Sequence, residues 1–283
     1  MTRLRTLVEL TRAPAALTVL GDTAVGAVAA GRPLRGRRAL LPLASVSLYW
    51  AGMALNDWAD RERDAVERPE RPIPAGRIGP DQALRVAAVL GSCGALAAAC
   101  AGPAEARVGA GLAASVAGYD AVLKHGAAGP AGMALCRGLD VLLGAGGDRA
   151  AWPAAAVLAG HTGGVTALAR GEVDGTGVPT AAAALVGTAL TAAAVVAGRC
   201  ASPRHRVAAA GAALVYAAKV GSAQWRTCRR PDGATVRAAT RAGIRGMVPL
   251  QVALVARRDL RAAAVLAAAV PLARHLGSRV EIA

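Results

Sequence analysis

The segment between residues 56 and 78 places amide and carboxylate side chains at every fourth position. Asn56, Asp60 and Asp64 are spaced i, i+4 and i+8, so on a helix they form one stripe. Carboxylates stacked along one face repel one another unless a cation lies between them. Oxygen ligands at this spacing suit Mg²⁺, which takes one or two carboxylates and completes its shell with water and substrate phosphate. The alternative is a solvated helix end whose charges have partners one turn away. The spacing favours a magnesium site.

The same segment carries a resemblance to a known family. Residues 56–78 read NDWADRERDAVERPERPIPAGRI, which closely resembles the first aspartate-rich motif of the UbiA-type intramembrane prenyltransferase superfamily. The resemblance implies that Asn56, Asp60 and Asp64 bind Mg²⁺ that bridges to an isoprenoid diphosphate. It also implies that a loop over the phosphates contains guanidinium groups suited to bidentate contacts, namely those of Arg68, Arg71 and Arg77.

A second polar segment begins at Tyr119 and ends at Lys124, one of only two lysines in the chain. It resembles the Tyr–Lys feature that follows the fourth helix in that family, where the ammonium group faces the diphosphate. The alternative is an ordinary lysine at the membrane interface. Arg137 and Asp140 follow within a neutral run, where charges are expected to face the bundle interior and pair. They serve either as a substrate-binding pocket wall or as a structural pair.

The third polar segment, residues 170–175, departs from the family pattern. The second family motif has aspartates four apart, whereas this chain offers Glu172 and Asp174, two apart. They could ligate a second Mg²⁺ if the segment is not helical, as Gly171 and Gly175 permit, or form a plain turn. This turn and the C-terminal region resemble the EboC-like prenyltransferases, a branch found beside genes of pigment and secondary metabolism. His161, upstream in a neutral run, is interpreted as a packing residue rather than a proton acceptor.

Long uncharged runs must position these polar segments. The chain has 283 residues, 54% of them apolar, 2% aromatic and 18% charged. This composition excludes disorder and a disulfide scaffold, and leaves an alanine-rich soluble helical protein or a membrane protein. Charges gather between neutral runs of about the 20 residues that a helix needs to cross a bilayer. We expect an all-α polytopic membrane bundle, a single domain over residues 1–283, with about nine transmembrane helices around a lipid-open cavity. Candidate spans lie near 13–31, 39–60, 83–104, 107–123, 128–147, 150–169, 176–198, 204–222, 242–257 and 260–276.

Loop parity and charge predict the orientation of the bundle. The loops near 61–82, 120–130 and 170–175 are separated by two spans each, so they emerge on one face. The segment 226–241 is expected to be a basic loop, with or without an amphipathic interfacial helix. Arginines in this segment and in the first of the three loops place that face in the cytoplasm of a bacterial cell, although the arginines at 32–38 would lie outside. The net charge is +15, but the arginines are not grouped with stacking aromatics as single-strand binding requires. We therefore expect no nucleic-acid partner.

The expected activity is Mg²⁺-dependent transfer of a prenyl group from an isoprenoid diphosphate to an aromatic or other small or lipophilic acceptor in the membrane. Asp60, Asp64 and Lys124 are the expected catalytic groups. One alternative is a terpene cyclase on the same scaffold, which would share every diphosphate residue. The other is a non-catalytic membrane transport or lipid-binding subunit. The acceptor, the prenyl chain length and the oligomeric state stay open.

Overall fold

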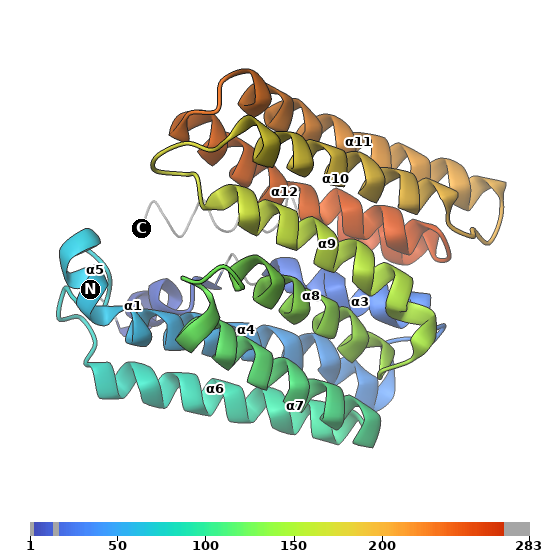
Figure 1. Ribbon diagram of the computed structural model, residues 1–283. Helices are drawn as coiled ribbons and strands as arrows, with labels where there is room; N and C mark the ends of the chain where they lie inside the picture. Colours follow the sequence, from blue (N-terminus) through green and yellow to red (C-terminus); the bar gives the residue numbers. More distant parts are fainter. Residues whose placement is uncertain (1–2, 14–16, 269–283) are drawn as a thin grey trace.

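A computed structural model describes residues 3–13 and 17–268, and every regular element within them is helical (Figure 1). This confirms the predicted all-α bundle. The long helices run side by side along one common direction. The helices of the first half are α1 (Arg3–Leu10), α3 (Leu20–Ala29), α4 (Leu41–Ala59), α5 (Arg61–Glu67), α6 (Pro80–Ala101), α7 (Pro103–Gly118) and α8 (Gly129–Ala145). Those of the second half are α9 (Trp152–Ala169), α10 (Val178–Ala197), α11 (Pro203–Arg229) and α12 (Gly233–Ala256).

Proline marks the beginning of most long helices. A proline in the first turn loses no hydrogen bond, because the first N–H groups of a helix have no intrahelical acceptor, and its fixed φ suits the helix. The proline occupies one of the first two positions in α4, α6, α7, α8, α9, α10 and α11. These prolines help to set where each helix begins, and therefore where the polar loops lie.

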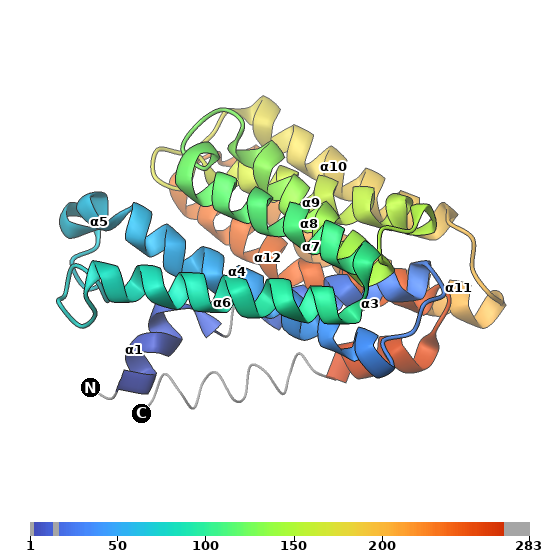
Figure 2. The ribbon, with the colours of Figure 1, turned by 90° about the horizontal axis from the view of Figure 1, so that it is seen from below.

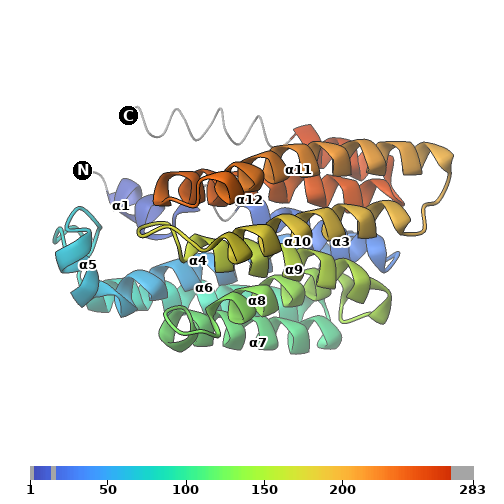
Figure 3. The same ribbon diagram turned by 45° about the horizontal axis from the view of Figure 1, so that its top comes forward.

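Glycine allows α3 and α8 to approach each other closely. A Cβ atom on Gly26 would lie 1.8 Å from the carbonyl oxygen of Val141, and one on Gly144 would lie 2.0 Å from that of Thr23. Small residues at such a contact are typical of packed membrane helices. In Figure 3, α10, α11 and α12 lie on one side of the bundle and α6, α7 and α8 on the other. The α8–α9 and α3–α12 contacts join the two halves.

The three polar loops emerge at one end of the bundle, as loop parity predicted. α5, the loop after α7 and the loop between α9 and α10 all lie on the left in Figure 1 and again in Figure 2. The segment 226–241, expected to be a basic loop with or without an interfacial helix, is mostly helical, and only residues 230–232 lie between two helices. α11 continues to Arg229, and α12 begins at Gly233, where the Asp232 side chain accepts a hydrogen bond from the Thr235 N–H. An N-terminal cap of this kind satisfies a backbone donor that would otherwise be unpaired.

Three of the described helical segments are long and apolar enough to cross a membrane. They are Gly36–Ala59, Pro80–Ala101 and Val178–Ala197. The number of about nine transmembrane helices and the lipid-open cavity stay predictions. The candidate spans 13–31 and 260–276 lie partly outside the described residues.

Candidate functional site

An amide oxygen and a carboxylate oxygen at the end of α4 converge on one cation. Asp60 directly follows α4, and its backbone N–H still donates to the Asn56 carbonyl at 3.0 Å. The Lys124 ammonium lies 3.0 Å from Asn56 Oδ1 and 2.8 Å from Asp60 Oδ2. A π-helical turn, Tyr119–Leu123, ends at this lysine, whose backbone N–H donates to the Tyr119 carbonyl at 3.0 Å. Single π-helical turns are frequent at functional sites. Here the turn places Lys124 beside Asp60.

His125 completes the surroundings of Asp60. Its Nε2 lies 3.1 Å from Asp60 Oδ1, while Arg63 donates to its Nδ1 at 2.9 Å. Since an arginine can only donate, Nδ1 accepts and Nε2 carries the proton toward the carboxylate. Burial raises the pKa of Asp60, but the hydrogen bonds from Lys124 and His125 outweigh it and hold that pKa below its usual range. Asp60 is therefore a carboxylate at neutral pH.

A second pair of carboxylates converges on a guanidinium group. Arg71 Nη1 lies 2.6 Å from Asp64 Oδ2 and 3.1 Å from Asp57 Oδ1, and Arg12 approaches Asp57 Oδ1 at 2.8 Å. The side chains of Asp57 and Asp64 are 4% and 5% exposed. Buried carboxylates require partners of this kind, because an unpaired buried charge is strongly destabilising.

The expected single stripe therefore divides between two cations. Asn56 and Asp60 face Lys124, whereas Asp64 faces Arg71 together with Asp57. Sequence analysis did not single out Asp57. The available signal was its spacing, because residues seven apart lie on the same side of a helix and Asp57 precedes Asp64 by seven.

The other expected phosphate-loop residues lie around this cluster. Arg68 is exposed at the end of α5. Arg77 pairs with Glu9 of α1 and donates to the Glu70 carbonyl at 2.6 Å, and both of these contacts lie outside the two carboxylate pairs. Tyr119 is half-buried at the beginning of the π-helical turn.

Asp120 is a buried acid that sequence analysis passed over. It is 7% exposed, and the charged groups that act on it are Lys124, Arg12, Asp60 and Asp57. A Cβ atom on Gly52 of α4 would lie 2.9 Å from its Oδ2, so the absence of a side chain at that glycine leaves room for this carboxylate. Asp120 thus belongs to the same group of charges.

The loop between α9 and α10 is held by its backbone. Thr176 N–H donates to the Pro231 carbonyl at 2.9 Å, and Arg237 donates to the Glu172 carbonyl oxygen. The segment is a turn rather than a helix, which is the condition that metal binding by both Glu172 and Asp174 requires. Glu172 is half-buried and Asp174 is exposed. Within residues 3–13 and 17–268, no three His, Cys, Asp or Glu side chains gather as a metal-binding group. Glu172 and Asp174 are therefore not brought into one such group with Asp60.

Arg137 lies inside the bundle and pairs with a residue that sequence analysis missed. Its guanidinium contacts Asp22 of α3 rather than Asp140, and lies 5.5 Å from the centre of the Tyr49 ring. Asp22 also accepts from Gln251 of α12 at 2.6 Å. Asp140 accepts from Ser45 at 2.9 Å. The charges face the interior as expected, but this network joins α3, α8 and α12, and no sequence pattern relates partners more than 100 residues apart.

His161 is a packing residue, in agreement with its interpretation from the sequence. It is 5% exposed, its Nδ1 lies 2.8 Å from the Tyr216 hydroxyl, and its Nε2 lies 3.1 Å from the Gly243 carbonyl oxygen. These contacts join α9 to α11 and α12. A buried imidazole with both nitrogens engaged is a satisfied polar group.

Known proteins similar to this chain point to one family. An 85-residue stretch is 44% identical to digeranylgeranylglyceryl phosphate synthase of Natronomonas pharaonis, covering 30% of this chain and 31% of that protein. An 88-residue stretch is 42% identical to 4-hydroxybenzoate octaprenyltransferase of Ralstonia nicotianae, covering 30% of each. The matched part thus spans about a third of the length of these relatives.

The fold extends the similarity over nearly the whole chain. The structure of a UbiA homolog from Archaeoglobus fulgidus bound to GPP and Mg²⁺ superposes with a TM-score of 0.62 at 17% identity, covering 86% of this chain and 99% of that one. The sequence model of the UbiA prenyltransferase family matches residues 18–242, which contain both carboxylate pairs and their cations except Arg12. The chain belongs to the UbiA prenyltransferase family.

Proposed function

We propose that this chain transfers a prenyl group from an isoprenoid diphosphate in a Mg²⁺-dependent reaction at the membrane, acting as one domain. The observation that carries the proposal is the convergence of Asn56 Oδ1 and Asp60 Oδ2 on a single cation, the Lys124 ammonium. Two oxygen atoms at the end of one helix that both contact one ammonium group can also serve as ligands of a hard cation. The names of the relatives differ in what they prenylate, and prenyl transfer is what they share.

The donor atoms present fit Mg²⁺. Asn56, Asp60 and Asp64 offer amide and carboxylate oxygens, the ligands that Mg²⁺ prefers. Each of these oxygens faces a basic side chain, so each already lies where positive charge is stabilised. Mg²⁺, when bound, supplies charge that stabilises a departing diphosphate.

Lys124 and Arg71 are the cations that we propose for the diphosphate itself. Both lie against the carboxylates and are 8% and 15% exposed. Fixed positive groups of this kind stabilise negative charge as it develops on a leaving group. We propose that Arg68, Arg77, Tyr119 and Arg137 contribute to substrate binding from the edges of the site. Arg137 would do so from inside the bundle, beside Tyr49.

We propose that Glu172 and Asp174 provide a second metal site from the other half of the bundle. Their loop lies at the same end of the bundle as α5 (Figure 1). Both residues lie in a turn rather than in a helix. Two metal sites on opposite sides of a diphosphate can stabilise its charge from both sides.

The acceptor in this proposal is an aromatic or other lipophilic molecule that reaches the site within the membrane. We place the polar end of the bundle at the cytoplasmic face of a bacterial membrane, on the basis of the arginines after Asp60. A lipophilic acceptor is consistent with the apolar helices that surround the site.

Pyrophosphate release tests this function. The purified protein in nanodiscs is given geranyl, farnesyl or geranylgeranyl diphosphate with Mg²⁺ and a lipid extract as the acceptor source, and a parallel reaction contains EDTA. We expect Mg²⁺-dependent release together with prenylated product in the wild type and the Glu62→Gln control, whose side chain is 87% exposed, and loss of both in Asp60→Asn. A cyclic hydrocarbon formed without acceptor would instead identify a terpene cyclase, and absence of Mg²⁺-dependent release would contradict the proposal.

A further inference from the structure

Four of the arginines at the opposite end of the bundle differ in their partners. Arg32 and Arg38 both contact the Glu105 carboxylate, and Arg38 also donates to the Gly144 carbonyl at 2.6 Å. Arg199 and Arg258 form no ion pair with a carboxylate among residues 3–13 and 17–268. These two arginines lie at the end of the bundle opposite the proposed diphosphate site, so that site does not account for them.

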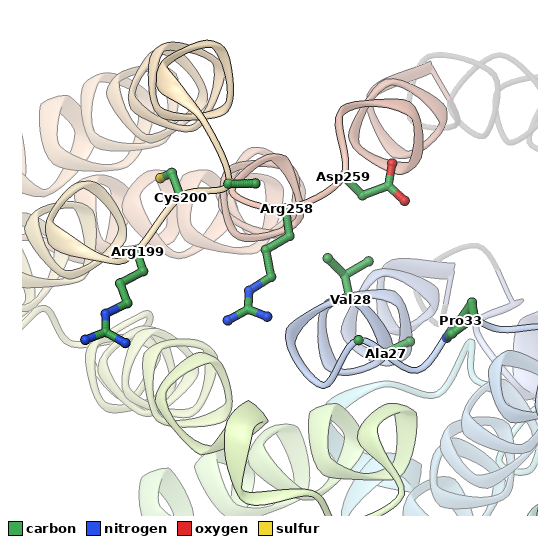
Figure 4. A pocket seen from close by; sticks show the side chains of 9 residues that line it. Ala27, Val28, Pro33, Arg199, Cys200, Arg258 and Asp259 are labelled. Carbon is green, nitrogen blue, oxygen red and sulfur yellow. The ribbon is translucent and has the colours of Figure 1, made fainter.

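Arg199 and Arg258 line a pocket of about 520 Å³. One wall is formed by the end of α3 and the residues after it, with the apolar side chains of Ala27, Val28 and Pro33. In Figure 4 the two side chains point in the same direction, the Arg258 guanidinium into the space beside α3 and the Arg199 guanidinium farther from that helix. The pocket therefore combines two positive charges with an apolar wall.

Backbone contacts hold the two arginines in place. The Ala201 N–H donates to the Arg257 carbonyl at 2.8 Å, and Arg257 Nε donates back to the Arg199 carbonyl at 3.3 Å. The loop that carries Arg199 is thus tied to the end of α12, next to Arg258. The backbone around the two arginines is therefore held by contacts within the protein.

The acid in this pocket is already engaged. Asp259 Oδ1 accepts from the backbone N–H groups of Arg261 and Ala262 at 3.0 Å and 2.9 Å, and in Figure 4 its carboxylate points away from both guanidinium groups. This carboxylate oxygen is thus hydrogen-bonded to the backbone, as in a helix cap. Arg199 and Arg258 line the same pocket, and an anion bound there would interact favourably with both positive charges.

We propose that this pocket binds the phosphate headgroup of an anionic membrane lipid. The planar guanidinium donors match phosphate oxygens, and the wall of Ala27, Val28 and Pro33 offers an apolar surface to the first part of an acyl chain. In a bundle that crosses the membrane, this end lies at the depth of the headgroups of the leaflet opposite the proposed diphosphate site, where guanidinium groups can contact the phosphate of a lipid headgroup. Lipid binding here would also explain why Arg199 and Arg258 lie at the end of the bundle that the positive-inside rule places outside.

Native mass spectrometry of the protein in a nonionic detergent tests the proposal. The protein is titrated with phosphatidylglycerol, with phosphatidylcholine of the same acyl chains, and with inorganic phosphate. The test variant is Arg199→Gln/Arg258→Gln. The matched control is Arg35→Gln/Arg37→Gln, which removes the same charge from exposed arginines at the same end of the bundle.

We expect phosphatidylglycerol affinity to fall about 30-fold in Arg199→Gln/Arg258→Gln, because each arginine near an anionic lipid contributes roughly fivefold, and to stay unchanged in the control. Unaltered pyrophosphate release by both variants would show that they are folded. Equal loss in the two variants, or no preference for phosphatidylglycerol over phosphatidylcholine in the wild type, would overturn the proposal. Inorganic phosphate that binds as tightly as the lipid would also overturn it, and would identify a site for a soluble anion.

Discussion

The two polar loop regions at the end of the bundle that carries α5 are held in different ways. In the first half, Asp57, Asp60 and Asp64 each contact a basic side chain from another segment, at 2.6 to 3.1 Å. In the second half, the loop at 170–177 is held through its backbone, because Thr176 N–H donates to the Pro231 carbonyl and the Glu172 carbonyl accepts from Arg237. The carboxylates of the first half are thus positioned by charge before a ligand arrives, whereas Glu172 and Asp174 form no ion pair among residues 3–13 and 17–268.

This difference has a consequence for metal binding. A preorganised site loses little conformational freedom when its ligand binds, and a site on mobile side chains must lose more. We therefore expect the first-half cluster to dominate both Mg²⁺ affinity and rate, with the second-half loop as a weaker contributor.

The largest effect is expected at Asp60. Asp60→Asn keeps the shape of the side chain but removes the charge that faces Lys124 and His125. We expect kcat for pyrophosphate release to fall about 10³-fold, by analogy with the removal of one electrostatic contact to a transition state. Glu62→Gln, on the exposed side of α5, should stay near wild type. An equal loss in both variants would remove the special position of the first-half cluster.

Lys124 is expected to have the next largest effect. Lys124→Met removes the ammonium shared by Asn56 and Asp60 and should lower kcat about 10²-fold. Lys124→Arg keeps the charge but changes its geometry, because a guanidinium is planar and wider, and should restore part of the rate. A wild-type rate in Lys124→Met would show that charge at this position does not matter and that Lys124 serves only in packing.

The second-half loop is expected to matter less. Glu172→Gln/Asp174→Asn should raise the Mg²⁺ concentration that gives half-maximal rate, with a loss in kcat/KM of about tenfold, equivalent to about 1.4 kcal/mol. Steady-state rates across a Mg²⁺ titration measure both quantities. A loss as large as that of Asp60→Asn would show that the two halves contribute equally despite their different positioning.

The smallest effect is a shift in pH dependence. Burial raises the pKa of Asp60, and the hydrogen bonds from Lys124 and His125 lower it below the usual range. The charge pairs of Asp60 therefore persist above the unfolded-state pKa and are lost as the pH falls through the folded-state value. His125→Ala removes one donor, so the acid limb of the pH–rate profile should move to higher pH. An unchanged or lower acid limb would show that His125 does not stabilise the Asp60 carboxylate.

The features that sequence predicted well are local. Asn56, Asp60 and Asp64 stand in one continuous segment, so their spacing gives their common location without knowledge of the fold. Long uncharged runs predicted the helices for the same reason. The basic segment at 226–241 misled, because its charges were taken as a loop whereas α11 and α12 occupy most of it. Charged residues at helix ends are compatible with both structures.

The features that sequence missed depend on contacts between distant segments. Arg12 reaches Asp57 across 45 positions, and Arg137 reaches Asp22 across 115. Arg77 stands in the motif but contacts Glu9 of α1, so membership of a motif did not reveal its partner. Partners of this kind follow from how helices pack, which hydropathy and spacing leave undetermined.

Direct observation of metal binding tests the central claim, that Asn56 and Asp60 form the cation site. Mn²⁺ serves as a paramagnetic substitute for Mg²⁺, and electron paramagnetic resonance measures its binding with and without a non-reactive isoprenoid diphosphate analogue. We expect diphosphate-dependent Mn²⁺ binding in the wild type and in Glu62→Gln, weakened at least tenfold in Asn56→Ala and Asp60→Asn. Mn²⁺ binding that survives both of the latter substitutions unchanged would contradict the assignment of the cation site to the end of α4.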